Sequence, residues 1–111
     1  MSVWIDIGSL EDLPLRGSRC VTTPTGKVGV FRVADGRVFA IRNECPHGGG
    51  PLSEGIVHGT SVTCPLHNWV ISLETGLAQG ADHGAVETIP LKVEQGRVLI
   101  LRGAIAGKAA A

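Results

Sequence analysis

Residues 45–69 of this 111-residue chain read CPHGGGPLSEGIVHGTSVTCPLHNW. The stretch contains two of the three cysteines and three of the four histidines, arranged as two mixed pairs. A C-x-H pair lies at Cys45 and His47, and a C-x2-H pair lies at Cys64 and His67, with sixteen residues between them. Proline fixes φ and glycine allows positive φ, so the residues around each pair are typical of loops. We therefore predict two ligand-bearing loops.

The mixed pairs match the ligand set of a Rieske cluster. A 2Fe–2S cluster of this type has two thiolates on one iron and two imidazoles on the other. Two loops that each carry one cysteine and one histidine supply this set, and each loop then gives one ligand to each iron. We predict that Cys45, His47, Cys64 and His67 bind one 2Fe–2S cluster. The neighbouring glycines allow backbone N–H groups to approach the sulfurs and tune the cluster.

Other chemistries explain the two pairs less well. Structural zinc sites usually group like ligands, as C-x2–4-C and H-x3–5-H, whereas each pair here is mixed. A disulfide between Cys45 and Cys64 would leave the histidines unexplained, and nucleophilic Cys–His catalysis could use only one pair. Outside the pairs, we expect His58 and His83 to face solvent. Cys20 is expected to be a small buried apolar residue.

Composition narrows the class of protein. The length suits one domain, and ten basic residues balance ten acidic ones. This balance leaves no basic surface for nucleic acid or membrane lipid. No apolar run approaches the roughly twenty residues that span a bilayer, and the N-terminal MSVWIDIGSLEDL has no secretory pattern. We expect a cytoplasmic protein that binds neither nucleic acid nor membrane.

Short runs of β-branched and aromatic residues separated by turn signals predict strands. We expect them at 3–7, 19–22, 27–34, 37–42, 55–58, 61–63, 69–73, 91–94 and 97–102. Asp35-Gly36 and Gln95-Gly96 predict two-residue hairpin turns in which both positions take positive φ. The pattern indicates an all-β fold, a Rieske-type sandwich or small barrel of antiparallel strands with a cluster-binding subdomain of two loops. We expect this domain over residues 1–103, its cluster-binding part over about 43–72, and a disordered tail over 104–111.

Residues near the pairs predict the redox potential. High-potential respiratory Rieske proteins resemble one another in carrying an extra, disulfide-bonded cysteine in each loop. At the matching positions this chain has Gly50 and Leu66. Those proteins also carry a Ser and a Tyr after the second histidine, where this chain has Trp69 and Ile71. Fewer hydroxyl donors stabilise the reduced, more negative cluster less. We predict a potential toward the lower end of the roughly −150 to +300 mV Rieske range.

Three runs carry a closer resemblance: NECPHGGGPLSEGIV, CPLHNWVISLETGLAQGAD and VETIPLKVEQGRVLI. Over roughly residues 3–101 the chain resembles the small subunit of assimilatory NAD(P)H-dependent nitrite reductase, and CPLHNW with LETG-x-A-x-G is the most specific part. The resemblance implies the same four ligands, Cys45, His47, Cys64 and His67. It also implies a large partner subunit that carries FAD and sirohaem and reduces nitrite to ammonia. Ala85 stands where relatives often have a cysteine, a difference that touches no ligand.

No second catalytic constellation is visible in the sequence. It contains no Gly-rich dinucleotide fingerprint after a strand, no Ser–His–Asp candidate and no second metal set. We therefore assign no catalytic residue and expect electrons to come from and go to other proteins. The alternative is a free-standing Rieske ferredoxin that works with a ferredoxin reductase and feeds an aromatic-ring or other oxygenase. A third interpretation is a structural or regulatory binding module whose site holds zinc or nothing.

Overall fold

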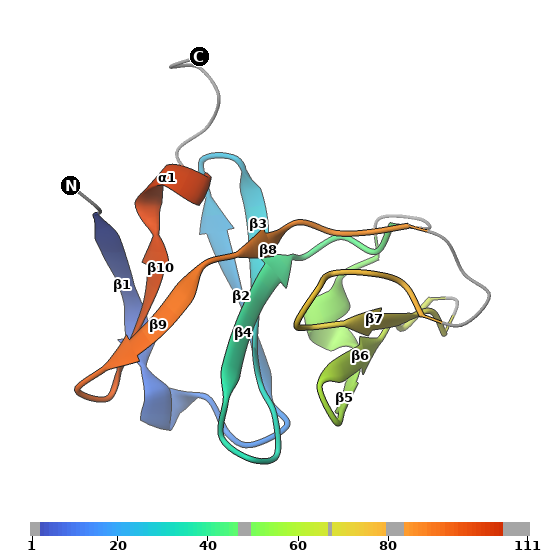
Figure 1. Ribbon diagram of the computed structural model, residues 1–111, viewed down its shortest axis with the longest axis horizontal. Coiled ribbons are helices and arrows are strands. Elements are labelled where there is room, and N and C mark those ends of the chain that lie inside the picture. Colours follow the sequence, from blue (N-terminus) through green and yellow to red (C-terminus); the bar gives the residue numbers. More distant parts are fainter. Residues whose placement is uncertain (1–2, 47–49, 67, 80–83, 106–111) are drawn as a thin grey trace.

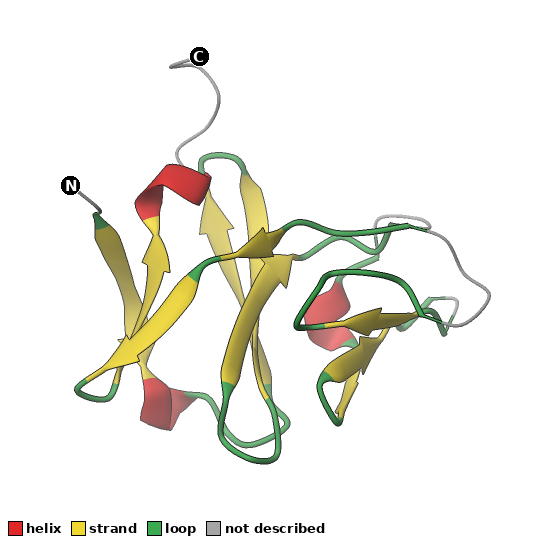
Figure 2. Ribbon diagram, viewed as in Figure 1, coloured by secondary structure: helices red, strands yellow, loops and turns green. Residues whose placement is uncertain are grey.

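Figure 1 shows a computed structural model of the chain, which describes residues 3–46, 50–66, 68–79 and 84–105. The strands are β1 (Trp4–Ser9), β2 (Ser18–Thr23), β3 (Gly26–Arg32), β4 (Val38–Arg42), β5 (Ile56–His58), β6 (Ser61–Thr63), β7 (Val70–Ser72), β8 (Thr88–Ile89), β9 (Leu91–Glu94) and β10 (Arg97–Leu101). The helical pieces are two 3-10 turns, η1 (Leu10–Asp12) and η2 (Leu52–Glu54), and the short helix α1 (Arg102–Ile105). Strands dominate the described chain (Figure 2), which confirms the all-β prediction.

The strands form three antiparallel sheets. Their orders are β1-β10-β9, β2-β3-β4-β8 and β5-β6-β7. The four-stranded sheet lies between the other two in Figure 1. This middle position explains why β3 is apolar on both faces, since successive side chains of a strand point to opposite sides. Val28 and Val30 pack toward the β1-β10-β9 sheet, whereas Phe31 packs toward β5-β6-β7.

Two hydrophobic cores separate the three layers. The first core contains Leu13, Val28, Val30, Ala40, Ile89, Val98 and Ile100. The second contains Phe31, Val33, Ile41, Cys45, Leu52, Val57, Val62, Cys64, Ile71 and Leu73. Fully burying a large aliphatic or aromatic side chain contributes about 1.5–3 kcal/mol. Because both cysteines of the predicted ligand pairs belong to the second core, the packing that stabilises this part of the fold also places the site.

The two predicted hairpin turns differ in the structure. Residues 95–96 both take positive φ, 50° and 76°, and β9 pairs directly with β10, which confirms that prediction. The prediction for Asp35 was wrong, because only Gly36 has a positive φ, of 97°. Here Gly36 N–H donates to Val33 O at 2.9 Å, and Val33 N–H donates to Arg37 O at 2.9 Å. This is a longer loop that ends in a left-handed glycine, another common hairpin connection.

Other expectations met mixed outcomes. Cys20 is exposed on β2, an edge strand, so the prediction that it is buried was wrong. His58 is exposed as predicted, whereas His83 lies outside the described residues. Neither β8 nor η2 was predicted. Residues 102–105 form α1, so the described start of the expected tail is helical, and 106–111 lie outside the described residues. Of the helices in the described ranges, none has the length and hydropathy needed to cross a bilayer.

An ion pair joins the two ends of the chain. The Asp6 carboxylate on β1 accepts hydrogen bonds from Arg97 Nε at 2.8 Å and Nη2 at 2.9 Å on β10, and from Gly8 N–H at 2.9 Å. The Arg97 hydrogen bond is the main reason that the pKa of Asp6 lies below its ordinary value. A lowered folded-state pKa adds stability above the unfolded pKa of about 3.9, and this stability is lost as the pH falls through the folded-state pKa.

We therefore expect Asp6→Asn to lower the thermal unfolding midpoint at neutral pH. The difference from the parent protein should shrink at an acid pH below the lowered pKa of Asp6, where its carboxylate is protonated as well. Glu11→Gln, a neighbouring exposed carboxyl outside this ion pair, is the matched control. A deficit of the same size at both pH values would contradict the role of the Asp6 charge.

Candidate functional site

The first predicted loop begins shortly after β4. Cys45 lies three residues beyond the end of β4, and only 3% of its surface is exposed to solvent. Its backbone N–H donates to Gly50 O at 2.8 Å, which closes the loop on itself. His47 lies outside the described residues. The structure therefore fixes the base of this loop and the position of its cysteine.

The second loop repeats this pattern. Cys64 follows directly on β6 and is fully buried, and its N–H donates to Trp69 O at 2.7 Å. In both loops the cysteine N–H thus bonds to the carbonyl five residues further along. Within the second loop, Asn68 takes a positive φ of 60° and its N–H donates to Cys64 O at 3.1 Å. His67 lies outside the described residues.

The two loops lie against each other. A Cβ atom placed on Gly50 would be 3.3 Å from Cys64 Sγ and 2.8 Å from Leu66 Cδ1. The missing side chain of Gly50 therefore allows the first loop to approach the cysteine of the second. Gly84 also packs closely here, since a Cβ on it would lie 2.9 Å from Pro46 Cβ and 3.5 Å from Trp69 Cζ3. The structure brings together the described parts of the two predicted loops.

The described donor atoms fit a 2Fe–2S cluster. Cys45 and Cys64 are both buried, one from each loop, and they belong to one core. Thiolates are the ligands that iron–sulfur clusters require. Among the described residues, no three His, Cys, Asp or Glu side chains gather as a metal site. Because His47 and His67 are not described, the full set of four ligands stays a prediction.

The positions that distinguish high-potential relatives are described. Gly50 and Leu66 are neighbours, where those relatives carry their paired cysteines. Ile71 is fully buried in the second core, and Trp69 packs against that core. Neither residue brings a hydroxyl to the site. The low potential stays a prediction.

Residues outside the pairs have other roles. His58 Nε2 lies 2.7 Å from Thr63 Oγ1 on the neighbouring strand. Cys20 lies on β2, where it lines an open pocket together with Asn43 and Ser53 at the base of the first loop. Sequence reasoning missed Asn43 and Ser53, whose side chains bond to each other at the base of the first loop. The signal in the sequence that could have indicated this pair is Asn43 itself, a short polar side chain two residues before Cys45.

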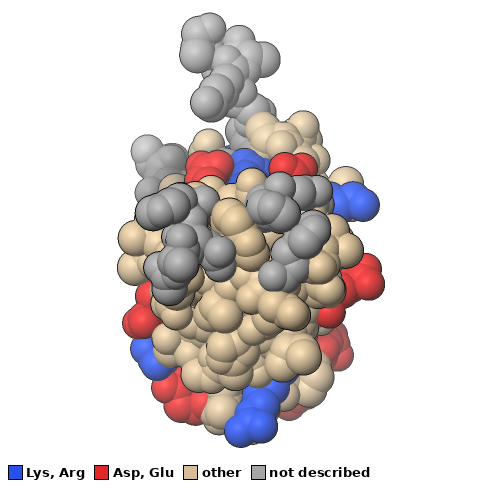
Figure 3. Space-filling model, turned by 90° about the vertical axis from the view of Figure 1, so that its right-hand side faces the viewer, with Lys and Arg blue, Asp and Glu red and all other residues tan. Residues whose placement is uncertain are grey.

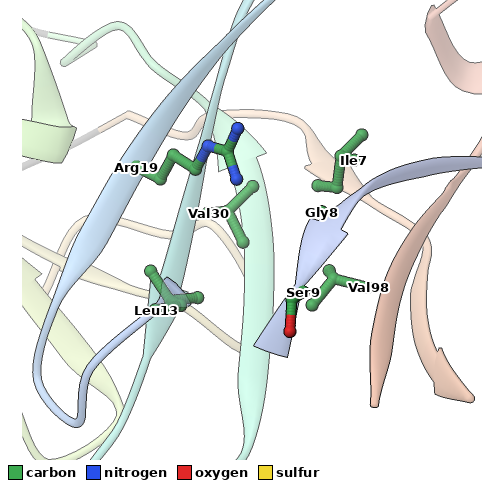
Figure 4. A pocket seen from close by; sticks show the side chains of 7 residues that line it. All are labelled: Ile7, Gly8, Ser9, Leu13, Arg19, Val30 and Val98. Atoms are coloured by element: carbon green, nitrogen blue, oxygen red, sulfur yellow. The ribbon is translucent and has the colours of Figure 1, made fainter. Parts of the chain in front are cut away.

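A small, partly open pocket lies beside the first core (Figure 4), whereas Cys45 and Cys64 belong to the second core. Its volume is about 10 Å³, and it is lined by Ile7, Gly8, Ser9, Leu13, Arg19, Val30 and Val98. Arg19 reaches across from β2, and a Cβ on Gly8 would lie 2.5 Å from its Nη1 atom. A space of this size holds about one water molecule. It therefore offers no room for an organic substrate.

The end of the molecule that carries the β5-β6-β7 sheet is poor in charge. In Figure 3 the Lys, Arg, Asp and Glu side chains lie mainly at the edge of this face, around an uncharged centre. Ile56, Leu66 and Leu77 of this region are exposed. Long-range electrostatic steering of a partner requires a charged surface. The described part of this face carries few charged side chains, so it can provide little steering.

The chain is similar to proteins of one family. A family model described as a Rieske-like 2Fe-2S domain matches residues 3–101. The ferredoxin component of the naphthalene 1,2-dioxygenase system of Pseudomonas aeruginosa is 34% identical over 98 residues, covering 87% of this chain and 93% of that protein.

Two solved structures share the fold over nearly their whole length. One is the complex of reduced oxygenase and oxidised ferredoxin in carbazole 1,9a-dioxygenase, with a TM-score of 0.82 and 25% identity over 89% of this chain and 93% of that chain. The other is described as an NADH-dependent nitrite reductase small subunit from Mycobacterium tuberculosis. Its TM-score is 0.82 at 26% identity, covering 92% of this chain and 96% of that chain.

Proposed function

Because the chain belongs to the Rieske-like 2Fe-2S domain family and carries one 2Fe–2S cluster, we propose that Cys45 and Cys64 bind one iron and His47 and His67 the other. The protein then transfers single electrons between partner proteins and is not catalytic alone. When bound, the cluster accepts and releases one electron. The chain's own residues hold it between two loops and cover the cysteines with an apolar core.

One observation carries this proposal: the two cysteine loops face each other at Gly50. A Cβ atom on residue 50 would lie 3.3 Å from Cys64 Sγ, so the absence of a side chain at Gly50 lets the first loop approach this cysteine closely. Each loop is closed by the hydrogen bond of its cysteine N–H. Two such loops, each with a histidine two or three residues after the cysteine, present the mixed ligand set that a Rieske cluster needs.

Low-temperature EPR of the dithionite-reduced protein tests the ligand set, with iron and acid-labile sulfide counted on the same sample. We expect a rhombic Rieske signal and about two irons per chain. Bound zinc without an EPR signal would overturn the proposal and favour a structural module.

As the partner we propose the large subunit of NAD(P)H-dependent nitrite reductase. The CPLHNW and LETG runs support this choice, as does the full-length likeness to the Mycobacterium tuberculosis structure. FAD and sirohaem would then belong to the large subunit, and nitrite would be reduced to ammonia there. A second candidate partner is an aromatic-ring oxygenase. It is favoured by the identity of 34% to the naphthalene 1,2-dioxygenase ferredoxin component over 87% of this chain.

Stopped-flow mixing of the reduced protein separates the two partners. The cluster absorbance reports its oxidation by a sirohaem-containing nitrite reductase large subunit or, in parallel, by a naphthalene-type oxygenase. We expect faster oxidation by the nitrite reductase subunit. Faster oxidation by the oxygenase would assign the protein to the second candidate function, and oxidation by neither would reject both.

We expect a low midpoint potential in a redox titration. Gly50 and Leu66 cannot form the disulfide between the loops, and Ile71 provides no hydroxyl donor to the cluster. Both differences leave the reduced cluster less stabilised than in high-potential relatives. A midpoint above about +100 mV, well inside the Rieske range, would contradict this prediction.

Electron transfer to the partner should depend only weakly on salt. The described face around the site is poor in charge (Figure 3), and the whole chain has a formal net charge of zero. Raising the ionic strength from roughly 0.05 to 0.5 M should change the second-order rate constant by less than about twofold, because little steering is screened. A fall of about tenfold or more over that range would show that charges guide docking.

A further inference from the structure

We propose that Asn43 is a positioning residue for the first cluster loop. With Ser53 it forms a side-chain clasp that holds the loop closed at its base. This inference rests on the proposed ligation by Cys45, which lies two residues after Asn43. The clasp is defined here as the two hydrogen bonds between Asn43 and Ser53.

The clasp has two contact points. Asn43 is only 4% exposed, and its Oδ1 atom accepts a hydrogen bond from the Ser53 backbone N–H at 2.6 Å. Its Nδ2 atom donates to Ser53 Oγ at 2.8 Å. The amide thus uses both its acceptor and its donor on a single residue. This arrangement fixes the position and the orientation of Ser53 relative to Asn43.

Both ends of the clasp are anchored to the same hairpin. Asn43 N–H donates to Lys27 O on β3 at 2.9 Å. The Ser53 carbonyl accepts a hydrogen bond from Ser18 Oγ on β2. Strands β2 and β3 are paired along their whole length. The base of the first loop is therefore tied to the middle sheet on both sides, whatever occupies the site.

The second loop is positioned differently. It connects β6 to β7, and Thr63 pairs directly with Val70 on either side of it. Strand pairing closes its base. The first loop instead runs from the end of β4 to η2, and no strand pairing among the described residues joins 43 to 53. The base of the second loop is closed by paired strands. The base of the first loop is closed instead by the hydrogen bonds between Asn43 and Ser53.

The middle sheet makes room for the amide at Gly29. A glycine within a strand often marks the close approach of another group. A Cβ on Gly29 would lie 3.1 Å from Asn43 Oδ1 and 2.8 Å from Phe31 Cε1. Gly29 lies within β3, so this strand has no side chain at the point where the Asn43 amide packs. The middle sheet therefore has space for the clasp at this position.

A loop held closed before binding loses less conformational entropy when the cluster binds. Removing outer partners of a metal site typically weakens metal retention by roughly 10- to 100-fold. Asn43 acts one step further out, through the backbone that leads to Cys45, so we expect the holoprotein of Asn43→Ala to lose its cluster to EDTA about tenfold faster than the parent protein, at the lower end of that range. Its EPR g-values should also spread, because Cys45 is held less uniformly. The visible absorbance measures the loss.

Three further variants make the test specific. Ser53→Ala keeps the bond from its N–H to Asn43 Oδ1 and should show a smaller effect, so it still reports if Asn43→Ala fails to fold. Asn43→Asp keeps an acceptor for the same N–H, and Ser53 Oγ–H can donate to the new carboxylate. This variant should retain the cluster better than Asn43→Ala. Ser72→Ala is the matched control, since Ser72 is a buried serine whose Oγ, within the described part of the chain, accepts from Glu74 and Thr75 N–H of its own turn.

Parent-like cluster loss and EPR spectra in both Asn43→Ala and Ser53→Ala would overturn the proposal. So would a lower unfolding temperature without any change in these two readouts, because the clasp would then act on stability alone. A Rieske signal that survives Cys45→Ser would instead reject the proposed ligation. The two failures are therefore distinguishable.

Discussion

Cys64→Ser should abolish the 2Fe–2S cluster. Cys64 is fully buried, and it lies where the first loop approaches the second at Gly50. A serine hydroxyl is a poor replacement for the thiolate that an iron–sulfur cluster requires. The purified variant should lack the visible absorbance and the Rieske EPR signal, and its iron content should fall from about two per chain to near zero.

Cys20→Ser is the matched control for this experiment. It makes the same chemical change at an exposed cysteine on β2, outside the second core. Its iron content, spectrum and midpoint potential should equal those of the parent protein. Loss of the cluster in Cys20→Ser, or its retention in Cys64→Ser, would contradict the ligand assignment.

Gly76→Ala should destabilise the fold strongly. Gly76 takes a φ of +78°, and a Cβ there would lie 2.1 Å from Val86 O. The Gly76 carbonyl also accepts the Val86 N–H at 2.8 Å, so the two backbones cannot separate without losing this bond. The left-handed backbone and the overpacking together cost about 2–5 kcal/mol in the free energy of unfolding. Urea unfolding followed by circular dichroism measures this loss.

Gly96→Ala separates the two contributions. Gly96 has almost the same φ, +76°, but nothing lies within 4 Å of its added Cβ. This variant should lose only the backbone contribution, about 1–2 kcal/mol. Equal losses in the two variants would show that the contact with Val86 O adds nothing at Gly76.

The Gly76 turn also bears on the site. Val86 packs against the second core, which contains both Cys45 and Cys64. A displaced Val86 would therefore loosen the packing around the cysteines as well as the turn. We expect the folded fraction of Gly76→Ala to hold its cluster less firmly than Gly96→Ala does. Comparing the two variants thus distinguishes a substitution in a local hairpin turn, at Gly96, from one that also disturbs a contact supporting the cluster-binding core, at Gly76.

Local patterns in the sequence predicted much of the fold. The hairpin at 95–96 needs left-handed residues and has them. The strands predicted at 55–58 and 61–63 appear as β5 and β6, which pair with each other. The prediction failed at Asp35, because its carboxylate accepts the Arg37 N–H at 3.0 Å in a longer loop. It failed at Cys20 because a short apolar side chain does not reveal that its strand lies at the edge of a sheet.

By itself, the sequence determined the all-β class and predicted the four cluster ligands. Ligand type and spacing, turn residues and alternating apolar positions are local properties of the chain. Only the tertiary structure decided that Gly50 lies against Cys64, that Asn43 reaches Ser53, and that β3 is buried on both faces. These contacts join residues from different elements, and their geometry depends on how three sheets pack around two cores. No local pattern contains that information, because side-chain contacts between elements arise only when the layers assemble.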